Sequence, residues 1–314
     1  MKQSLQPLED THSSISLQLN TKTLGLAIAA SSLFLFLCSS IRHTLFRSGA
    51  FDLGIFDQAV YLISQGQPPI SSFLGVHILG DHASSILYPL SLFYKIYPDV
   101  RWLLAVQAVA LALGALPAWA LARQAGLKQG QAVGIAAAYL MYPVIPAANL
   151  FDFHPEVIAI PALLGAVLAA RLGKTAWFVA AIVLFLSCKE ILSLTVAAMG
   201  VWLFVFEKRR LCGAIAIFSG CAWFLIATQA IIPSFTNLDA GIGTETGMAA
   251  GMSRYAYLGG TLPEIAKNLL LKPHLVLERV LSLDTLRYLA FLALPVIWGL
   301  SIWDLAPLIG DLQR

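Results

Sequence analysis

The sequence predicts an all-α, polytopic membrane protein, and three observations support this fold class. The 314-residue chain is 58% hydrophobic, only 12% charged and has a mean hydropathy of +0.77, outside the range of soluble globular domains. Several apolar runs approach the roughly 20 residues that a helix needs to cross a hydrocarbon core about 30 Å thick. The net charge is only +3 and its cations are dispersed, so we expect no nucleic-acid partner.

The N-terminal segment, residues 1–22, is polar and lacks the features of a secretory signal, so we expect a disordered cytoplasmic tail. A single transmembrane domain over residues 23–314 follows. The four cysteines lie in or beside apolar runs and form no CxxC pair, which predicts neither a disulfide framework nor a zinc site.

About eight transmembrane helices are predicted. Six come from separate apolar runs, and two more are the arms of a longer run, 176–206, that Lys189 and Glu190 interrupt. The six separate runs are Thr23 to Ile41, Trp102 to Ala122, Ala132 to Leu150, Val157 to Arg171, Leu211 to Ile232 and Leu286 to Trp303.

Loop charges predict the sidedness. The cations of three short connections, 123–128, 171–174 and 208–210, face the cytoplasm by the positive-inside rule, which also places the N-terminus on the cytoplasmic side. Both ends of the interrupted run are then cytoplasmic, so the run is a hairpin. Lys189 and Glu190 would then lie at its outward-facing bend. Because the first arm of 13 residues rises only about 20 Å, short of a full crossing, this bend could lie below the membrane surface.

Two external segments follow from this topology, at about 42–101 and 233–284. Within the first, residues 84–97 are expected to form an interfacial or re-entrant helix, because a crossing there would move Arg123 and Lys128 outside. The second begins with a glycine-rich stretch that could act as a lid. It continues with leucines and valines at helical spacing, whose intervening cations could contact lipid phosphates or simply form a solvated face.

Four polar motifs emerge on the external side, although only loop lysines and arginines entered the topology. They are FDLGIFDQ (51–58), GVHILGDH (75–82), NLFDFHPE (149–156) and the Lys189-Glu190 bend. Intramembrane or interfacial ionisable groups are costly, so their convergence indicates a functional site.

The two aspartates of FDLGIFDQ differ in their expected roles. Asp52 precedes a plausible helix and could cap it, whereas Asp57, five residues later, points elsewhere on that helix and is the freer carboxylate. If Asp52 is not a cap, either residue could be a general base or bind a divalent cation.

Histidines and carboxylates in the other motifs offer metal ligands or hydrogen-bonding groups. His77, Asp81 and His82 lie within six residues, and Asp152 and His154 are two apart. A divalent metal is an open alternative, with Asp57, His82, Asp152 and His154 as its ligands; a lone histidine is more often hydrogen-bonded structure. Pro155 disfavours helical geometry at His154, and Glu156 would complement the dipole of the next helix.

The motifs and their order resemble a bacterial membrane family, domain of unknown function 2079 (DUF2079). FDLGIFDQ, GDH, NLFDFHPE, Lys-Glu, RYAYLGG and LERVLSLDTLRYL carry the resemblance, over about residues 51–294. That family looks like a branch of the GT-C type glycosyltransferases. The resemblance implies transfer of a sugar from a polyprenyl-phosphate donor in membrane lipid, with Asp57 or Asp52 as the essential loop aspartate. Ile191 stands where a further acidic residue is expected, and such families often continue through more spans.

The expected substrate-binding residues are the remaining polar groups of the external motifs and one arginine of the second segment. They are His77, Asp81, His82, Asp152, His154, Glu156, Lys189, Glu190 and Arg254. Two alternatives to an enzyme remain: a non-enzymatic protein that binds metal or lipid, and a small-solute transporter. The transporter is disfavoured because the two halves of the chain show no internal similarity.

Overall fold

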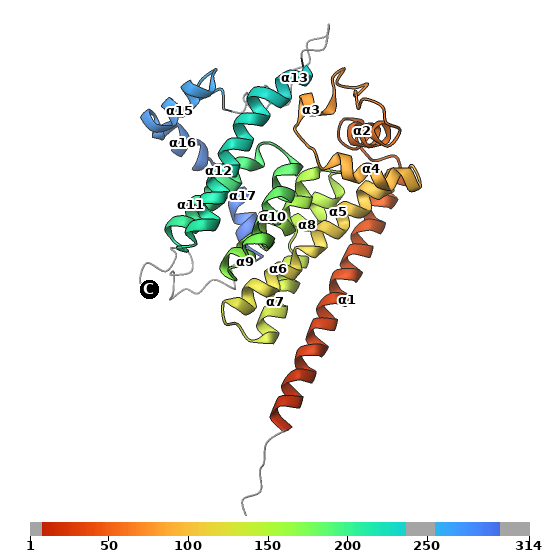
Figure 1. The fold of residues 1–314 in the computed structure, drawn as a ribbon, viewed down its shortest axis with the longest axis vertical. Coiled ribbons are helices and arrows are strands. Elements are labelled where there is room, and N and C mark those ends of the chain that lie inside the picture. The colour runs from red at the N-terminus through yellow and green to blue at the C-terminus, as the bar shows by residue number, and fades with distance from the viewer. Residues whose placement is uncertain (1–7, 237–254, 296–314) are drawn as a thin grey trace, which may run out of the picture.

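The computed structural model describes residues 8–236 and 255–295, and within these ranges the chain is helical, with one isolated β-bridge between Ile70 and His77 (Figure 1). The first half of the chain forms α1 (Leu8–Thr44), η1 (Ala50–Gly54), α2 (Ile55–Ser64), α3 (Ile78–Asp81), α4 (Leu87–Ile96), α5 (Arg101–Leu113), α6 (Ala115–Gln124), α7 (Gln129–Leu140) and α8 (Val144–Leu150). The second half forms η2 (Pro155–Ile158), α9 (Ala159–Arg171), α10 (Thr175–Cys188), α11 (Leu192–Val205), α12 (Arg210–Ile226), η3 (Ala227–Ile231), α13 (Ile232–Thr236), α15 (Leu262–Leu271), α16 (Pro273–Val280) and α17 (Leu283–Ala293).

Four helical stretches of the described chain are long and apolar enough to cross a membrane: Thr21–Thr44, Arg101–Gln124, Gln129–Leu150 and Arg210–Thr236. Large apolar side chains on these stretches face outward, among them Leu26, Phe34 and Phe218, each more than 60% exposed. A helix that exposes such groups suits a lipid environment, because hydrocarbon replaces the protein core as their surroundings. The chain is therefore an α-helical membrane protein, as predicted.

The remaining apolar helices are shorter. The 13-residue α9 and the 14-residue α10 and α11 each rise only about 20 Å. The larger number of about eight crossings stays a prediction, and residues 296–303 of the last expected span lie outside the described ranges. The break in the long run is confirmed, since α10 ends at Cys188 and α11 begins at Leu192, on either side of Lys189 and Glu190.

The start of the first helix differs from the prediction. α1 begins at Leu8, so it includes most of the segment 1–22 that was expected to be disordered (Figure 1). Polar residues there do not end the helix, because its sequence from Leu8 to Lys22 contains neither proline nor glycine. The two helices expected in the first external segment are present as α2 and α4.

Glycines allow close approach of α11 and α12, which form the tightest helix pair. A Cβ atom on Gly220 would lie 2.6 Å from the carbonyl oxygen of Ser193, and one on Gly200 would lie 2.6 Å from the amide nitrogen of Ile217. Small residues at a helix interface permit this backbone contact in membranes, where lipid gives no hydrophobic drive for association.

The bundle has two chemically distinct ends. At one end, which we call the basic end, Arg171 contacts Gln124 and Glu207, and Arg209 contacts the Arg171 carbonyl, so the three predicted cytoplasmic connections meet. Since α9 and α11 run toward that end, the residues that precede them lie at the opposite end. That opposite end, which we call the paired end, holds the ion pairs Arg42–Asp152 and Lys189–Glu156 and the histidine–carboxylate pairs His154–Asp52 and His82–Glu190.

Candidate functional site

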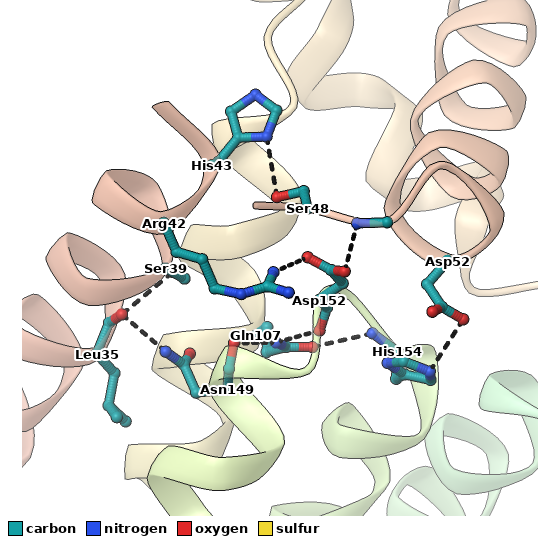
Figure 2. A network of polar contacts seen from close by, with 11 residues as sticks. Leu35, Ser39, Arg42, His43, Ser48, Asp52, Gln107, Asn149, Asp152 and His154 are labelled. Carbon is teal, nitrogen blue, oxygen red and sulfur yellow. Dashed lines mark hydrogen bonds and ion pairs between the residues drawn. The ribbon is translucent and has the colours of Figure 1, made fainter. Parts of the chain in front are cut away.

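Asp152 anchors the motif NLFDFHPE to the end of α1. Its carboxylate accepts hydrogen bonds from the guanidinium of Arg42 and, at 2.7 Å, from the amide nitrogen of Gly49 (Figure 2). Asp152 is only 5% exposed and has a φ of +76°, a left-handed conformation that aspartate tolerates better than most residues. The carboxylate is thus committed to holding two chain segments together.

Gln107 of α5 also holds the loop that carries Asp152. The sequence motifs did not predict a role for Gln107. Its Nε2 donates to the carbonyl oxygens of Asn149 and Asp152, at 3.1 and 2.7 Å, and its Oε1 accepts from the amide nitrogen of His154 at 2.9 Å (Figure 2). The side chain is fully buried. A glutamine inside an otherwise apolar span was the available signal, because a buried amide must find partners for its donors and acceptor.

The loop ends at His154, which faces Asp52. His154 Nε2 lies 3.7 Å from Asp52 Oδ1 (Figure 2). The imidazole also stacks on Phe151, with ring centroids 5.1 Å apart. The backbone of His154 is extended before Pro155, as predicted, and Glu156 falls in the first turn of η2. Asp52 is 44% exposed, so this pair is open to solvent.

Neither Asp52 nor Asp57 has the local role that was predicted for it. Asp52 caps no helix: it lies within η1, and the residue that caps α2 is Gly54, without a side-chain hydrogen bond. Asp57 is not the freer carboxylate, because its Oδ1 accepts a 2.6 Å hydrogen bond from the hydroxyl of Tyr94 between α2 and α4. Burial raises the pKa of Asp57 above its usual value, and the Tyr94 hydrogen bond only partly offsets this.

Lys189 and Glu156 form the second pair near the loop. Lys189 Nζ lies 2.6 Å from Glu156 Oε1, whereas Glu156 Oε2 is buried and has no hydrogen-bond partner among the described residues. Burial alone would raise the pKa of Glu156, but the ammonium of Lys189 outweighs burial and holds this pKa below its ordinary value. The ionised pair therefore joins the α10–α11 break to the start of α9.

His82 and Glu190 join the first external segment to the same break. His82 Nδ1 lies 2.9 Å from Glu190 Oε1, and the amide nitrogen of Ala83 donates to Glu190 Oε2 at 3.1 Å. Glu190 is only 6% exposed. Burial would raise its pKa, yet the hydrogen bond from His82 lowers the pKa below its usual value, so the carboxylate stays ionised. Asp81 Oδ2 lies 4.0 Å from His82 Nε2.

His77 has a structural position. It caps α3 through its Nδ1, which accepts from the amide nitrogen of Leu79 at 3.1 Å, and it stacks on Phe235 of α13 with ring centroids 4.3 Å apart. α3 and α13 also meet at Gly80, whose carbonyl accepts from the hydroxyl of Thr236 at 3.4 Å. Burial lowers the pKa of His77. Arg254, the other outlying candidate, is outside the described residues.

The structure does not bring the predicted metal ligands together. Within residues 8–236 and 255–295, no three His, Cys, Asp or Glu side chains form a group that could hold a metal ion. Asp57, His82, Asp152 and His154 are instead engaged with Tyr94, Glu190, Arg42 and Asp52, respectively, because charged groups near an apolar bundle pair locally. A separate hollow of about 420 Å³ lies elsewhere, lined by α7 and Pro295.

These features define the class of protein first: an α-helical membrane protein with a charged, hydrogen-bonded site at one end of its bundle. A family model described as "Predicted membrane protein (DUF2079)" matches residues 42–312, so the chain belongs to the DUF2079 family, as the motifs predicted. No curated protein matches the chain. No solved structure matches it either.

Proposed function

We propose that the protein is a GT-C-like membrane glycosyltransferase that transfers a sugar from a polyprenyl-phosphate donor at the extracytoplasmic face. One observation carries the proposal: Asp52 and His154, from motifs about 100 residues apart, form a carboxylate–imidazole pair that is open to solvent. A carboxylate beside an imidazole can accept a proton from an incoming hydroxyl group. The paired end would face outward, with α1 entering from the cytoplasm, in a bacterial inner membrane.

In the proposed reaction Asp52 is the general base. It takes the proton of the acceptor hydroxyl while the acceptor oxygen forms a bond to the anomeric carbon of the sugar. The bond from that carbon to the phosphate oxygen breaks, and its electron pair leaves with the polyprenyl phosphate. His154 is the positioning residue next to the base, and Gln107 and Asp152 hold the loop that carries it.

Lys189 is the cation that we assign to the departing phosphate, since its partner Glu156 follows His154 by two residues in the same motif. Its ammonium is 20% exposed and shared with Glu156, so the phosphate would compete with a carboxylate for it. Electrostatic stabilisation of the leaving group of this kind is a large contribution to transfer reactions. The described donors do not fit a divalent metal, and no step is assigned to one.

The experiment compares the wild-type chain with Asp52→Asn in nanodiscs supplied with a panel of radiolabelled polyprenyl-phosphate hexoses and pentoses. Release of polyprenyl phosphate is followed by thin-layer chromatography. The wild type should turn over at least one donor, and Asp52→Asn should be at least 100-fold slower, the usual size of general-base effects. Asp99→Asn, which alters an external carboxylate paired with Arg101, is the matched control and should keep full activity.

Asp57→Asn decides between the two aspartates. If Asp57→Asn is inactive and Asp52→Asn is fast, the sequence-based choice of Asp57 is right and the assignment to Asp52 is wrong. If folded wild type turns over none of the donors, the transferase proposal fails. The non-enzymatic alternative, a protein that only binds lipid, would then be supported by retention of the donor without its cleavage.

A further inference from the structure

The basic end of the bundle carries a charge excess that the proposed chemistry does not use. Its seven cations are Arg123, Lys128, Arg171, Lys174, Lys208, Arg209 and Arg210. The three connections that carry them contain no carboxylate, and Glu207, directly before the third connection, is the nearest one in the sequence. Lys128, Lys174, Lys208, Arg209 and Arg210 are exposed. An excess of cations at one surface attracts anions, so this end has a binding preference independent of the site at the other end.

The Glu207 carboxylate is already occupied. The Arg171 guanidinium contacts both oxygens of Glu207, with Nε 3.1 Å from Oε2 and Nη2 2.5 Å from Oε1, in the bidentate geometry that arginine favours. The same guanidinium lies 5.6 Å from the centroid of the Trp202 ring. Glu207 is therefore neutralised by one cation, and the other six remain uncompensated by that carboxylate.

Hydrogen bonds order this end. Arg209 Nη2 donates to the carbonyl oxygen of Arg171 at 2.7 Å, which ties the α11–α12 connection to the end of α9. Arg171 Nη1 reaches Gln124 Oε1 at 3.5 Å, which adds the end of α6. Three chain segments are held together in this way, so the backbone positions that carry the cations are set before a ligand binds, although the exposed side chains themselves are not held by these bonds.

The basic end lies where apolar helices end. Gln124 and Arg210 are termini of membrane-spanning stretches, and α9 and α10 end and begin at Arg171 and Thr175. Residues at this level of a membrane protein meet lipid headgroups rather than hydrocarbon, and anionic headgroups bind clusters of lysine and arginine. Lys174 and Arg209 also precede α10 and α12 without any side-chain cap, so first-turn amides face the same level.

We propose that the basic end binds the phosphate headgroups of anionic phospholipids in the leaflet where these helices end. Zwitterionic lipids carry the same phosphate with a compensating cation, so they should bind more weakly. Lipid binding at the basic end does not depend on the glycosyl transfer proposed for the paired end.

The experiment measures binding of phosphatidylglycerol and phosphatidylcholine to the purified full chain in detergent, by native mass spectrometry. The test variant is Lys174→Gln/Lys208→Gln/Arg210→Gln, and the control Arg47→Gln/Lys95→Gln/Arg101→Gln removes three exposed charges outside the basic end. Phosphatidylglycerol should be retained preferentially by wild type and control. The test variant should bind it roughly 100-fold more weakly, because each lysine or arginine contributes a few-fold to attraction by an anionic surface.

Three results would overturn the proposal: equal binding of the two lipids by wild type, wild-type binding by the test variant, or displacement of phosphatidylglycerol by inorganic phosphate at an equal phosphate concentration. The last result would indicate a site for free anions. If the triple variant fails to fold, as judged by its elution from size exclusion, salt provides the second measurement. Wild-type binding should weaken between 50 and 500 mM KCl, and salt-independent binding would also contradict the proposal.

Discussion

The two ends of the bundle hold charge in opposite ways. At the paired end, Arg42, Lys189, His82 and His154 each have a carboxylate partner, and those partners come from distant parts of the chain. At the basic end one carboxylate serves seven cations. The paired end therefore spends its charges on positioning its own loops, whereas the basic end keeps charge available for an outside partner.

The same molecule therefore uses charged side chains in two ways: at the paired end they bind one another, and at the basic end most of them stay exposed. Buried pairs at the paired end satisfy one another, since an unpaired charge in an apolar setting is costly. Asp52, 44% exposed, is the carboxylate of those pairs that is most open to solvent. Substitutions that remove one partner should consequently cost more stability at the paired end than at exposed ion pairs.

The largest stability effect is expected for Asp152→Ala. The change leaves the Arg42 guanidinium and the Gly49 amide without their acceptor and places alanine at a φ of +76°. We expect a loss of about 2–4 kcal/mol, nearer the lower value because Arg42 is partly exposed, as measured by thermal unfolding in detergent. Asp99→Ala, which breaks the exposed pair with Arg101, should cost less than about 1 kcal/mol. If both substitutions lowered the free energy of unfolding equally, the pairs at the paired end would be no more stabilising than an exposed ion pair.

A smaller, pH-dependent effect is expected for Glu190. Its pKa is lowered in the folded chain, so the stabilisation is complete above the ordinary carboxyl value of 4.5 and is lost as the pH falls through the lowered value. Glu190→Gln should therefore unfold more readily than wild type at pH 7, by about 2 kcal/mol, and the difference should shrink as the pH falls below 4.5. Unfolding curves over this range check it; a gap that stays constant would mean that ionisation of Glu190 contributes nothing.

The smallest effect is expected for Asp57→Asn. The raised pKa of Asp57 means that its contribution to stability is present below 3.8 and is lost as the pH rises through the folded value. Asparagine keeps an oxygen that can accept from Tyr94 but carries no charge to bury. The variant should thus lie within about 1 kcal/mol of wild type, and should compare more favourably at pH 8 than at pH 4. Strong destabilisation at pH 8 would show that the ionised carboxylate is needed there.

Much of the architecture could be predicted because membrane helices are encoded locally. Long apolar runs marked the four long spans, and the Lys189-Glu190 interruption marked the end of α10. Loop cations predicted which connections share an end, and the contacts of Arg171 and Arg209 bring these connections together. α1 begins at Leu8, before the apolar run that predicted the span, because polar composition alone does not stop a helix that lacks proline and glycine.

The candidate site was predictable by motif but not by pairing. The motifs indicated that Asp152, His154, Lys189 and Glu190 lie at the same end of the bundle. Their partners were not predictable, because they depend on packing between distant segments. Asp57 illustrates this. Its hydrogen-bond partner Tyr94 lies 37 residues further along the chain, and no local sequence pattern links Asp57 to Tyr94. Gln107 was overlooked because it lies within an otherwise apolar run.

The contact of α3 with α13 has a mechanical consequence. A Cβ atom at Gly80 would lie 2.8 Å from the carbonyl oxygen of Phe235, so at this point the backbones of the two helices are in direct contact. His82 follows Gly80 by two residues and holds the α10–α11 break through Glu190. A movement of α13 would consequently displace α3 and, with it, His82. In this way α3 connects the start of the second external segment to the paired end.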